Sequence, residues 1–390
     1  MSAPSAERIW NHLLHELLPI WGEHGFDARY GGFVNQLTPQ LDAAPDDHKR
    51  LLVQTRQIYV FSEAATHGAG DWALDLASAG VEFLRNRFWD DEHGGFFLTV
   101  TSAGERLDAS KDLYAHSFVL LSMAAYFRAT ADAEALRLAE RTLGLLEAHL
   151  ADDAAGGFVD RAARNWVAEA GPRRQNPHMH LLEALLALID VGVEAAGGPC
   201  RALATRTLRL LGDRFVCEHT GALRENFDRH WQVMPGPPGR VVEPGHHFEW
   251  VWLLHEAARV IGDDGLLARA ESLFRFAAAH GVDAEQGGVY DEIDVDGAVL
   301  RSSKRLWPQT EYLKALAVRG ERDALERMLT LCLDRYLDAS SGLWREHLER
   351  DGRPRSVLIN ATSLYHIWTG LSASARRLEA NSGGLSAASD

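Results

Sequence analysis

The 390-residue sequence predicts an all-α fold, an (α/α)6 barrel in which six helical hairpins form a closed ring in one domain. Two observations predict it: a glycine-centred phrase recurs at a near-constant interval, and helical periodicity fills each interval with about two helices. Neither end of the chain carries a polar capping repeat, which favours a closed ring over an open solenoid. We expect short β-hairpins at one mouth of the barrel.

The glycine-centred phrase occurs six times. It is written YGGF, HGGFF, AGGFVD, TGALREN, QGGVYDE and SGLWREH in chain order. Its glycines are separated by 63, 62, 65, 66 and 55 residues, at Gly31, Gly94, Gly156, Gly221, Gly287 and Gly342. Each phrase follows a helical segment and precedes residues that favour strands, such as Phe, Val or Tyr. Each therefore indicates a tight turn followed by a short strand or hairpin.

Twelve helices are predicted, in six pairs with one helix of each pair inside the ring. Apolar residues recur at the three- and four-residue spacing of amphipathic helices. The predicted helices span 6–21, 51–65, 72–88, 112–127, 133–150, 180–193, 201–215, 248–261, 266–279, 307–318, 322–336 and 361–371. The first would pack against the last to close the ring. We expect a single domain over 1–380 and a disordered tail over 381–390, where NSGGLSAASD is small and polar.

Composition narrows the possible partners. The chain is 46% hydrophobic and 24% charged, as is typical of a globular protein with a sizeable core. Its formal net charge of −15 argues against nucleic acid and anionic membranes as partners. The three cysteines are an odd number without metal spacing, which indicates reduced thiols in a cytoplasmic protein. No apolar run approaches 18 residues and no basic leader is evident, so neither a membrane span nor a signal peptide is expected. We expect a monomer or a homodimer.

One stretch, VEPGHHFEWVWLLH at 242–255, suggests chemistry. Proline and glycine suit a helix start, and Glu249 suits the positive end of the helix dipole. His246 and Glu249 are three residues apart and share a helix face. An imidazole oriented by a carboxylate is the usual layout of a general acid or base. The alternative is a polar first turn ahead of a buried helix.

Comparable polar residues begin the other helices that follow a glycine phrase. Repeats related by a ring axis place equivalent positions at the same end, so these side chains should meet at one mouth, in a cleft typical of a small-molecule site. The expected site residues are Arg56, Tyr114, His116, Asn176, His180, Glu183, His246, Glu249, Trp307, Gln309, Glu311 and His366. The segment 233–243, with three prolines, is expected to be an active-site loop.

Each of these residues also has a purely structural interpretation. A single histidine on an amphipathic helix is more often a satisfied core or rim group, and Arg56 could tie two helices together. His180 has Glu183 three residues later, whereas His178 does not share its face and is treated as supporting. His247 is expected at the rim. Zinc is a competing interpretation of the histidines, but no HExxH-like spacing occurs, so neither metal nor cofactor is expected.

Six motifs carry a resemblance to a known family: QTRQIYVFSEA, KDLYAHSFVLL, NPHMHLLEALLAL, EPGHHFEWVWLL, KRLWPQTEYLKA and YHIWTG. Together they resemble the N-acylglucosamine 2-epimerase superfamily over residues 6–377, and its mannose and sulfosugar isomerase branch more than its acylglucosamine or cellobiose epimerases. The resemblance implies an (α/α)6 barrel acting on free sugars without a metal. It implies that His246 and His366 are catalytic and that Arg56 holds the enediolate oxygens. It also implies that His180 and Glu249 bind and orient the sugar.

The hypothesis is an isomerase that interconverts D-mannose and D-fructose, with D-lyxose and D-xylulose as a weaker pair. Imidazoles can remove a proton next to a carbonyl near neutral pH, and a guanidinium suits the two oxygens of a cis-enediolate. Three alternatives stay open. They are a sugar 2-epimerase (mannose/glucose, N-acylglucosamine or cellobiose type), a glycoside hydrolase or lyase using Glu249 with Glu311 or Glu183, and a sugar-binding barrel without activity.

Overall fold

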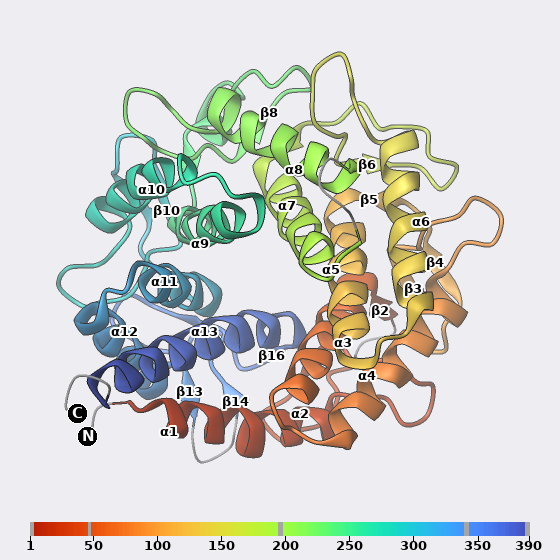
Figure 1. Ribbon diagram of the computed structural model, residues 1–390, viewed down its shortest axis with the longest axis horizontal. Helices are drawn as coiled ribbons and strands as arrows, with labels where there is room; N and C mark the ends of the chain where they lie inside the picture. Colours follow the sequence, from red (N-terminus) through yellow and green to blue (C-terminus); the bar gives the residue numbers. More distant parts are fainter. Residues whose placement is uncertain (1–3, 46–47, 194–197, 339–342, 387–390) are drawn as a thin grey trace.

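The computed structural model describes residues 4–45, 48–193, 198–338 and 343–386. Within these residues, twelve helical segments alternate between an inner and an outer ring (Figure 1). The inner helices are α3 (Leu51–Thr66), α5 (Leu113–Thr130), α7 (Gln175–Asp190), α9 (Pro244–Ile261), α11 (Leu306–Arg319) and α13 (Ala361–Ser386). The outer segments are α1 (Ala6–Asn11) with η1 (His12–Leu17) and α2 (Leu18–His24), α4 (Asp71–Phe83) with η2 (Leu84–Phe88), α6 (Ala133–His149), α8 (Pro199–Leu210) with η3 (Leu211–Phe215), α10 (Leu266–His280) and α12 (Arg322–Arg335).

The contacts between elements are those that the predicted barrel requires. Each inner helix contacts the next along the chain, α13 contacts α3, and α1 packs on α13. Antiparallel strand pairs connect consecutive repeats, and β1 (Gln36–Leu37) pairs with β16 (Ile359–Asn360), joining the first repeat to the last. The other pairs are β2 (His48–Arg50) and β4 (Arg106–Asp108) on β3 (Thr99–Thr101), β5 (Lys111–Asp112) with β6 (Arg161–Ala162), β7 (Arg173–Arg174) with β8 (Asn226–Phe227), β9 (Val241–Val242) and β11 (Val299–Arg301) on β10 (Glu292–Asp294), β12 (Lys304–Arg305) with β15 (His347–Leu348), and β13 (Leu337–Asp338) with β14 (Leu343–Trp344).

The two rings differ in how their helices are buried. The inner helix α5 is buried from Ala115 to Tyr126, whereas the outer helix α6 buries only one stripe, which includes Ala135, Ala139 and Leu146. The core therefore lies between the rings, and polar side chains on inner helices face either the central channel or a neighbouring turn. None of the described helices is both long enough and apolar enough to cross a membrane.

Helix starts were predicted less well than helix existence. α7 begins at Gln175 instead of residue 180, because Pro177 lies in the first turn, where a proline costs no hydrogen bond. α9 begins at Pro244, so its histidines lie inside the first turn. At the other end of the chain, α13 continues to Ser386, past the expected boundary at residue 380. The expected tail beyond it, residues 387–390, lies outside the described residues.

On five of the six inner helices, α3, α5, α7, α9 and α11, one side chain fixes a glycine phrase to the barrel. Gly95 illustrates the phrase: its φ is +71°, and a Cβ would lie 2.5 Å from the ring of Trp166. The backbone N–H after the phrase donates to a Gln or neutral His on the following inner helix. These donors and acceptors are Phe33 to Gln54, Phe96 to His116, Phe158 to His178, Leu223 to His247 and Val289 to Gln309, at 2.7–3.0 Å. We call these five acceptors the tie residues.

Candidate active site

A cavity of about 270 Å³ opens at the end of the barrel where the inner helices begin. Eight of the twelve predicted site residues line it. The lining residues are Arg50, Leu52, Arg56, Tyr114, Asn176, His180, Glu243, His246, Glu249, Arg305, Trp307, Thr362, Ser363 and His366. Glu243 ends the proline-rich segment, so that segment does contribute to the site. The predicted convergence of helix starts on one mouth is therefore present in the structure.

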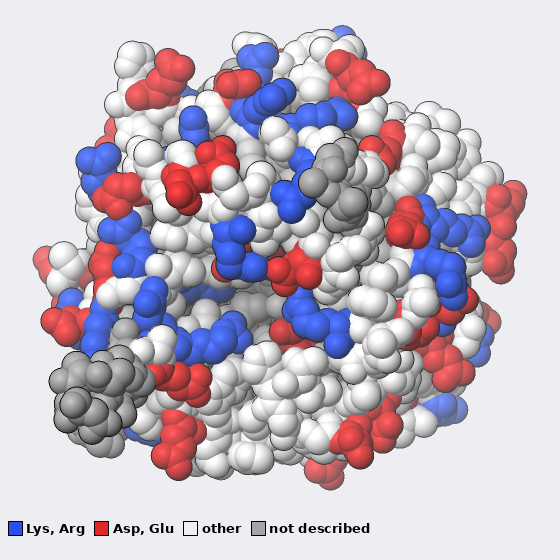
Figure 2. Space-filling model, in the orientation of Figure 1, with Lys and Arg blue, Asp and Glu red and all other residues white. Residues whose placement is uncertain are grey.

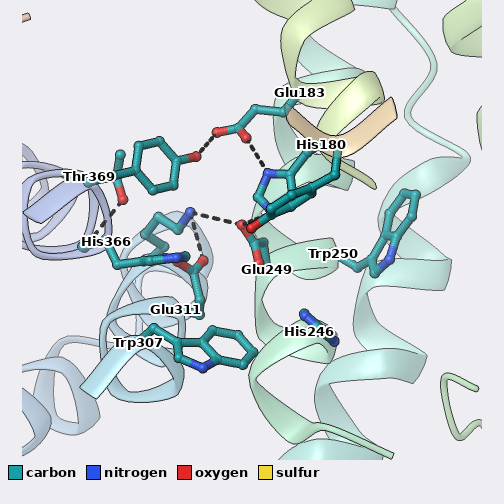
Figure 3. A network of polar contacts seen from close by, with 12 residues as sticks. His180, Glu183, His246, Glu249, Trp250, Trp307, Glu311, His366 and Thr369 are labelled. Atoms are coloured by element: carbon teal, nitrogen blue, oxygen red, sulfur yellow. Dashed lines mark hydrogen bonds and ion pairs between the residues drawn. The ribbon is translucent and has the colours of Figure 1, made fainter. Parts of the chain in front are cut away.

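Three histidines in this cavity share one construction, and Figure 3 shows them together with the carboxylates Glu183 and Glu311. In each, Nδ1 bonds a buried carboxylate: His180 to Glu183 (2.9 Å), His246 to Glu225 (3.0 Å) and His366 to Glu311 (2.7 Å). Among the described residues, no hydrogen bond engages any of the three Nε2 atoms. A carboxylate on Nδ1 fixes the ring and leaves Nε2 to react.

His246 is held in its protonated form. The sequence predicted Glu249 as its partner, but the partner is Glu225, which lies in the fourth glycine phrase, TGALREN. Burial lowers the pKa of His246, yet the negative charges of Glu225 and Glu243 outweigh it and raise the pKa to about 9. Glu225 is itself fixed, because it accepts hydrogen bonds from Gln175 Nε2 and from the backbone N–H of Glu243. At neutral pH, His246 is a proton donor.

His366 is held neutral. Burial lowers its pKa, and the positive charges of Arg56 and Lys314 lower it further, so that it lies well below the usual range. Its partner Glu311 accepts from Nδ1 and forms an ion pair with Lys314 Nζ at 2.6 Å. The lone pair of His366 is therefore on Nε2. At neutral pH this side chain is a proton acceptor.

Trp307 lies beside both of these histidines. Its ring centroid is 4.9 Å from that of His246 and 5.8 Å from that of His366. The cavity thus places an acid and a base beside the same aromatic face, in a space of limited size. A planar or near-planar substrate against this face would be within reach of both.

Arg56 contributes a positive charge without a carboxylate partner in the described part of the chain. Its Nη2 donates to Tyr114 Oη (2.8 Å) and its Nη1 to the carbonyl of Thr362 (3.0 Å), while Nε lacks a hydrogen-bond partner there. The guanidinium carbon lies 4.4 Å from the Phe118 ring centroid and 4.8 Å from that of Tyr365. The side chain does tie two helices, and it also faces the cavity with a rigid fork suited to two oxygens.

His180 and Glu249 form the floor between these groups. His180 Nε2 lies 3.8 Å from Glu249 Oε1, which has no hydrogen-bond partner among the described residues. Burial and the charge of Glu311 raise the pKa of Glu249 to about 8, with Lys314 opposing. Glu249 is therefore mostly protonated at neutral pH and can donate a hydrogen bond to a sugar hydroxyl. Both residues line the cavity, and their role in binding the sugar stays a prediction.

Four predicted site residues do not line the cavity. His116 and Gln309 are tie residues that accept backbone N–H groups of the glycine phrases, and this placement corrects their assignment to the sugar site. Burial lowers the pKa of His116 to about 4, as its acceptor role requires. Glu183 and Glu311 lie behind His180 and His366 and orient them.

Two further histidines are tie residues. His178 accepts the N–H of Phe158, in keeping with its exclusion from the His180 face. His247 was expected at the rim, but it is fully buried and accepts the N–H of Leu223. Burial lowers the pKa of both to about 3. In five repeats a buried backbone N–H of the glycine phrase needs an acceptor from the following inner helix, and sequence reasoning did not take this need into account.

Sequence reasoning missed Glu225, Glu243, Lys314 and Tyr365. A signal for Glu225 was present: four residues after the phrase glycine, the chain also carries Asp160, Asp291 and Glu346. An acidic residue therefore recurs at the same position in these repeats, where it faces the start of the next inner helix. Lys314 and Tyr365 gave no signal, because each is a single polar group inside an otherwise apolar helical pattern.

Groups that could hold a metal overlap with this site. The sets His180–Glu183–Glu249, Glu225–Glu243–His246 and Glu249–Glu311–His366 each bring three ligand atoms within 4.8 Å of one another. Each set also contains a Nδ1–carboxylate hydrogen bond that a cation would have to displace. The positive charge of Lys314 beside Glu311 opposes a cation in the third set.

The sequence matches a family model described as N-acylglucosamine 2-epimerase (GlcNAc 2-epimerase) over residues 31–370. The chain belongs to this family. The mannose-6-phosphate isomerase of Rhizobium meliloti (strain 1021) is 35% identical over 365 residues, 90% of this chain and 91% of the relative. A cellobiose 2-epimerase of Bacteroides fragilis is 29% identical over 369 residues, 89% of this chain and 91% of the relative.

A solved D-mannose isomerase structure, 21% identical, covers 96% of this chain and 100% of its own with a TM-score of 0.86. This structural similarity supports the fold. The family and the relatives show that the chain is an isomerase, in the sense that includes epimerases, of a family that acts on sugars.

Proposed function

We propose that this protein is an aldose–ketose isomerase that interconverts D-mannose and D-fructose, with D-lyxose and D-xylulose as a weaker pair. The observation that carries the proposal is the contrast between the two histidines. His366 is neutral and His246 is protonated, and both leave Nε2 free in one cavity beside Arg56.

His366 is the proposed base. Its Nε2 removes the proton from C2 of the open-chain aldose, and the electron pair forms the C1–C2 double bond of a cis-enediolate. The same imidazolium then returns the proton to C1, while the hydroxyl proton of O2 passes to O1, so that C2 becomes the ketone and O1 becomes a hydroxyl. Glu311 keeps the Nδ1–H in place throughout and stabilises the transient positive charge.

His246 is the proposed acid. Its Nε2–H donates a proton to the ring oxygen as the bond between C1 and that oxygen breaks, and the anomeric hydroxyl loses its proton to solvent, which leaves the carbonyl on which the chemistry depends. Arg56 supplies its two-nitrogen fork to O1 and O2 as they gain charge. Glu249, as a neutral acid, and His180 orient the hydroxyls further along the sugar.

A sugar 2-epimerase is the second candidate. His246 and His366 share one cavity, so an acid on the far face of the enediolate could return the proton to C2 and invert it. The cellobiose 2-epimerase among the relatives is consistent with that outcome. A hydrolase is disfavoured, because it needs a second carboxylate in the cavity beside Glu249. The two candidates, Glu311 and Glu183, lie behind the cavity wall and are hydrogen-bonded to His366 and His180.

We propose an unphosphorylated substrate, although the first relative is named for mannose 6-phosphate. A phosphate at C6 requires uncompensated positive charge. Arg305 at the cavity is already bonded to Glu243 (2.7 Å) and to Asp291 (3.1 Å), and Arg56 is assigned to the enediolate oxygens at C1 and C2. We also propose a cytoplasmic location, because the sequence has three cysteines, an odd number without the paired spacing of a disulfide frame or a metal site.

The test is incubation with D-mannose in D₂O, followed by NMR. Fructose carrying deuterium at C1 supports the isomerase, and glucose deuterated at C2 without fructose supports the epimerase. D-Mannose 6-phosphate and cellobiose are run in parallel as competing substrates. No product and no deuterium uptake from D-mannose refutes the proposed reaction.

A further inference from the structure

A second cavity lies at the opposite end of the barrel. It has a volume of about 360 Å³ and is lined by the last turns of the inner helices, whereas the active site is lined by their first turns. Figure 2 views the barrel from this end, and the surface there is hollowed near the centre with Lys and Arg side chains around the hollow. We call it the rear cavity. The reaction proposed above does not use it.

The wall of the rear cavity carries a chain of ion pairs that crosses four inner helices. Arg128 bonds Glu63 (2.8 Å) and reaches Asp190 (3.5 Å). Arg259 bonds the other oxygen of Asp190 (3.0 Å) and also Glu256 (2.9 Å). Arg128 and Arg259 are each matched by carboxylates, and Arg376, the third arginine of the wall, contacts His67 Nε2 (3.4 Å). The wall therefore offers alternating hydrogen-bond donors and acceptors, with four carboxylates against three arginines.

The deeper wall is aromatic and contains polar groups without partners. Tyr59 and Trp252 line the cavity, and within the described residues neither the Tyr59 hydroxyl nor the Trp252 indole N–H makes a hydrogen bond. Both side chains are partly exposed, and a phenol or an indole usually pairs its polar group with a partner or with water. These two groups therefore lack a donor or acceptor that a ligand could supply.

Glu183 connects the two cavities. It lines the rear cavity, and its two oxygens accept from His180 Nδ1 at 2.9 Å and from the hydroxyl of Tyr365. His180 in turn lines the active site. A ligand that bonds Glu183 from behind would weaken or turn the hydrogen bond that orients His180.

The chemistry of the wall selects a ligand class. An anion would meet four carboxylates, Glu63, Glu183, Asp190 and Glu256, and a cation would meet the arginines that pair with them. A neutral polyol suits both, because each hydroxyl donates and accepts, and aromatic rings suit the apolar face of a sugar. The rear cavity is larger than the active site, which under the proposed function holds one hexose.

We propose that the rear cavity binds a second molecule of neutral monosaccharide and transmits its occupancy to His180 through Glu183. The choice of sugar rests on the proposed function. The ligand class rests on the cavity wall alone.

The test counts binding sites for D-fructose by equilibrium dialysis with labelled sugar, at isomerisation equilibrium. The wild type is expected to bind two equivalents. Ala187→Trp, which fills the rear cavity, should bind one, and Arg56→Ala should lose the other site. Tyr59→Phe is a milder variant that keeps the packing, and it should weaken the rear site about fivefold, the effect of one hydrogen bond.

Kinetics test the connection. The rate of the wild type should depart from a single hyperbola at high sugar, while Ala187→Trp should follow one and keep the wild-type rate at low sugar. If the wild type binds one equivalent of D-fructose, or Ala187→Trp binds two, the rear cavity is not a sugar site. If the wild type and Ala187→Trp give identical curves of rate against sugar concentration, the rear site does not act on His180. Because dialysis counts sites without turnover, an enzyme inactive on mannose refutes the proposed function and still leaves the rear site measurable.

Discussion

Glu225→Gln tests whether one carboxylate makes His246 an acid. Glu225 accepts from His246 Nδ1 at 3.0 Å, and both side chains are only 7% exposed, so solvent screens their interaction little. A pKa of about 9, against an ordinary value of 6.5, corresponds to roughly 3 kcal/mol in favour of the charged imidazole. Glutamine keeps the shape of the side chain and removes its charge.

The pH above which activity is lost should then be lower in Glu225→Gln than in the wild type. In the wild type, the rate falls as His246 loses its proton, near pH 9. In Glu225→Gln, the alkaline limb of kcat/KM should move down by about 1–3 pH units, the usual effect of removing one adjacent opposite charge. The acidic limb, set by His366 in this mechanism, should stay where it is.

Stability gives an independent measure with a defined sign. Because folding raises the pKa of His246, its stabilisation is complete below pH 6.5 and disappears as the pH rises through about 9. Urea unfolding should therefore show Glu225→Gln less stable by about 1–3 kcal/mol at pH 6, with the difference smaller at pH 9.5.

Glu243→Gln is the matched control, since Glu243 raises the same pKa but does not bond the ring. It should move the limb in the same direction by a smaller amount. An unchanged alkaline limb in folded Glu225→Gln would refute the assignment of His246 as the acid.

Three further outcomes are expected. His366→Ala should lower kcat by about 10²–10⁴-fold, measured by NMR, while dialysis still detects sugar binding. Arg56→Lys should lower kcat by about 10²–10³-fold with a smaller change in KM, because an ammonium cannot present the same fork to both enediolate oxygens. His247→Ala should cost about 1–3 kcal/mol in urea unfolding and leave KM near the wild-type value. His247→Gln should restore stability, because Gln54 and Gln309 make the same bond in other repeats.

The fold could be predicted because its signals are local and repeated. The glycine phrase recurs in every repeat, and apolar spacing marks a helix wherever it occurs. Twelve helical segments and the mouth at which polar residues gather followed from these signals. Helix starts such as Gln175 did not, since a proline is equally acceptable just before a helix or in its first turn.

The role of each polar side chain was decided by tertiary structure. His178 and His180 are two residues apart, which turns the helix by more than half a revolution, so one faces a glycine phrase and the other the channel. The same offset separates His247 from Glu249 and Gln309 from Glu311.

Sequence alone therefore determined that buried polar residues would begin the inner helices, because the repeat and its periodicity are written along the chain. It could not determine which of them react. That depends on the side chains that each helix directs toward the cavity, and on partners as distant in sequence as Glu311 and His366, which the packing of α11 against α13 brings to 2.7 Å.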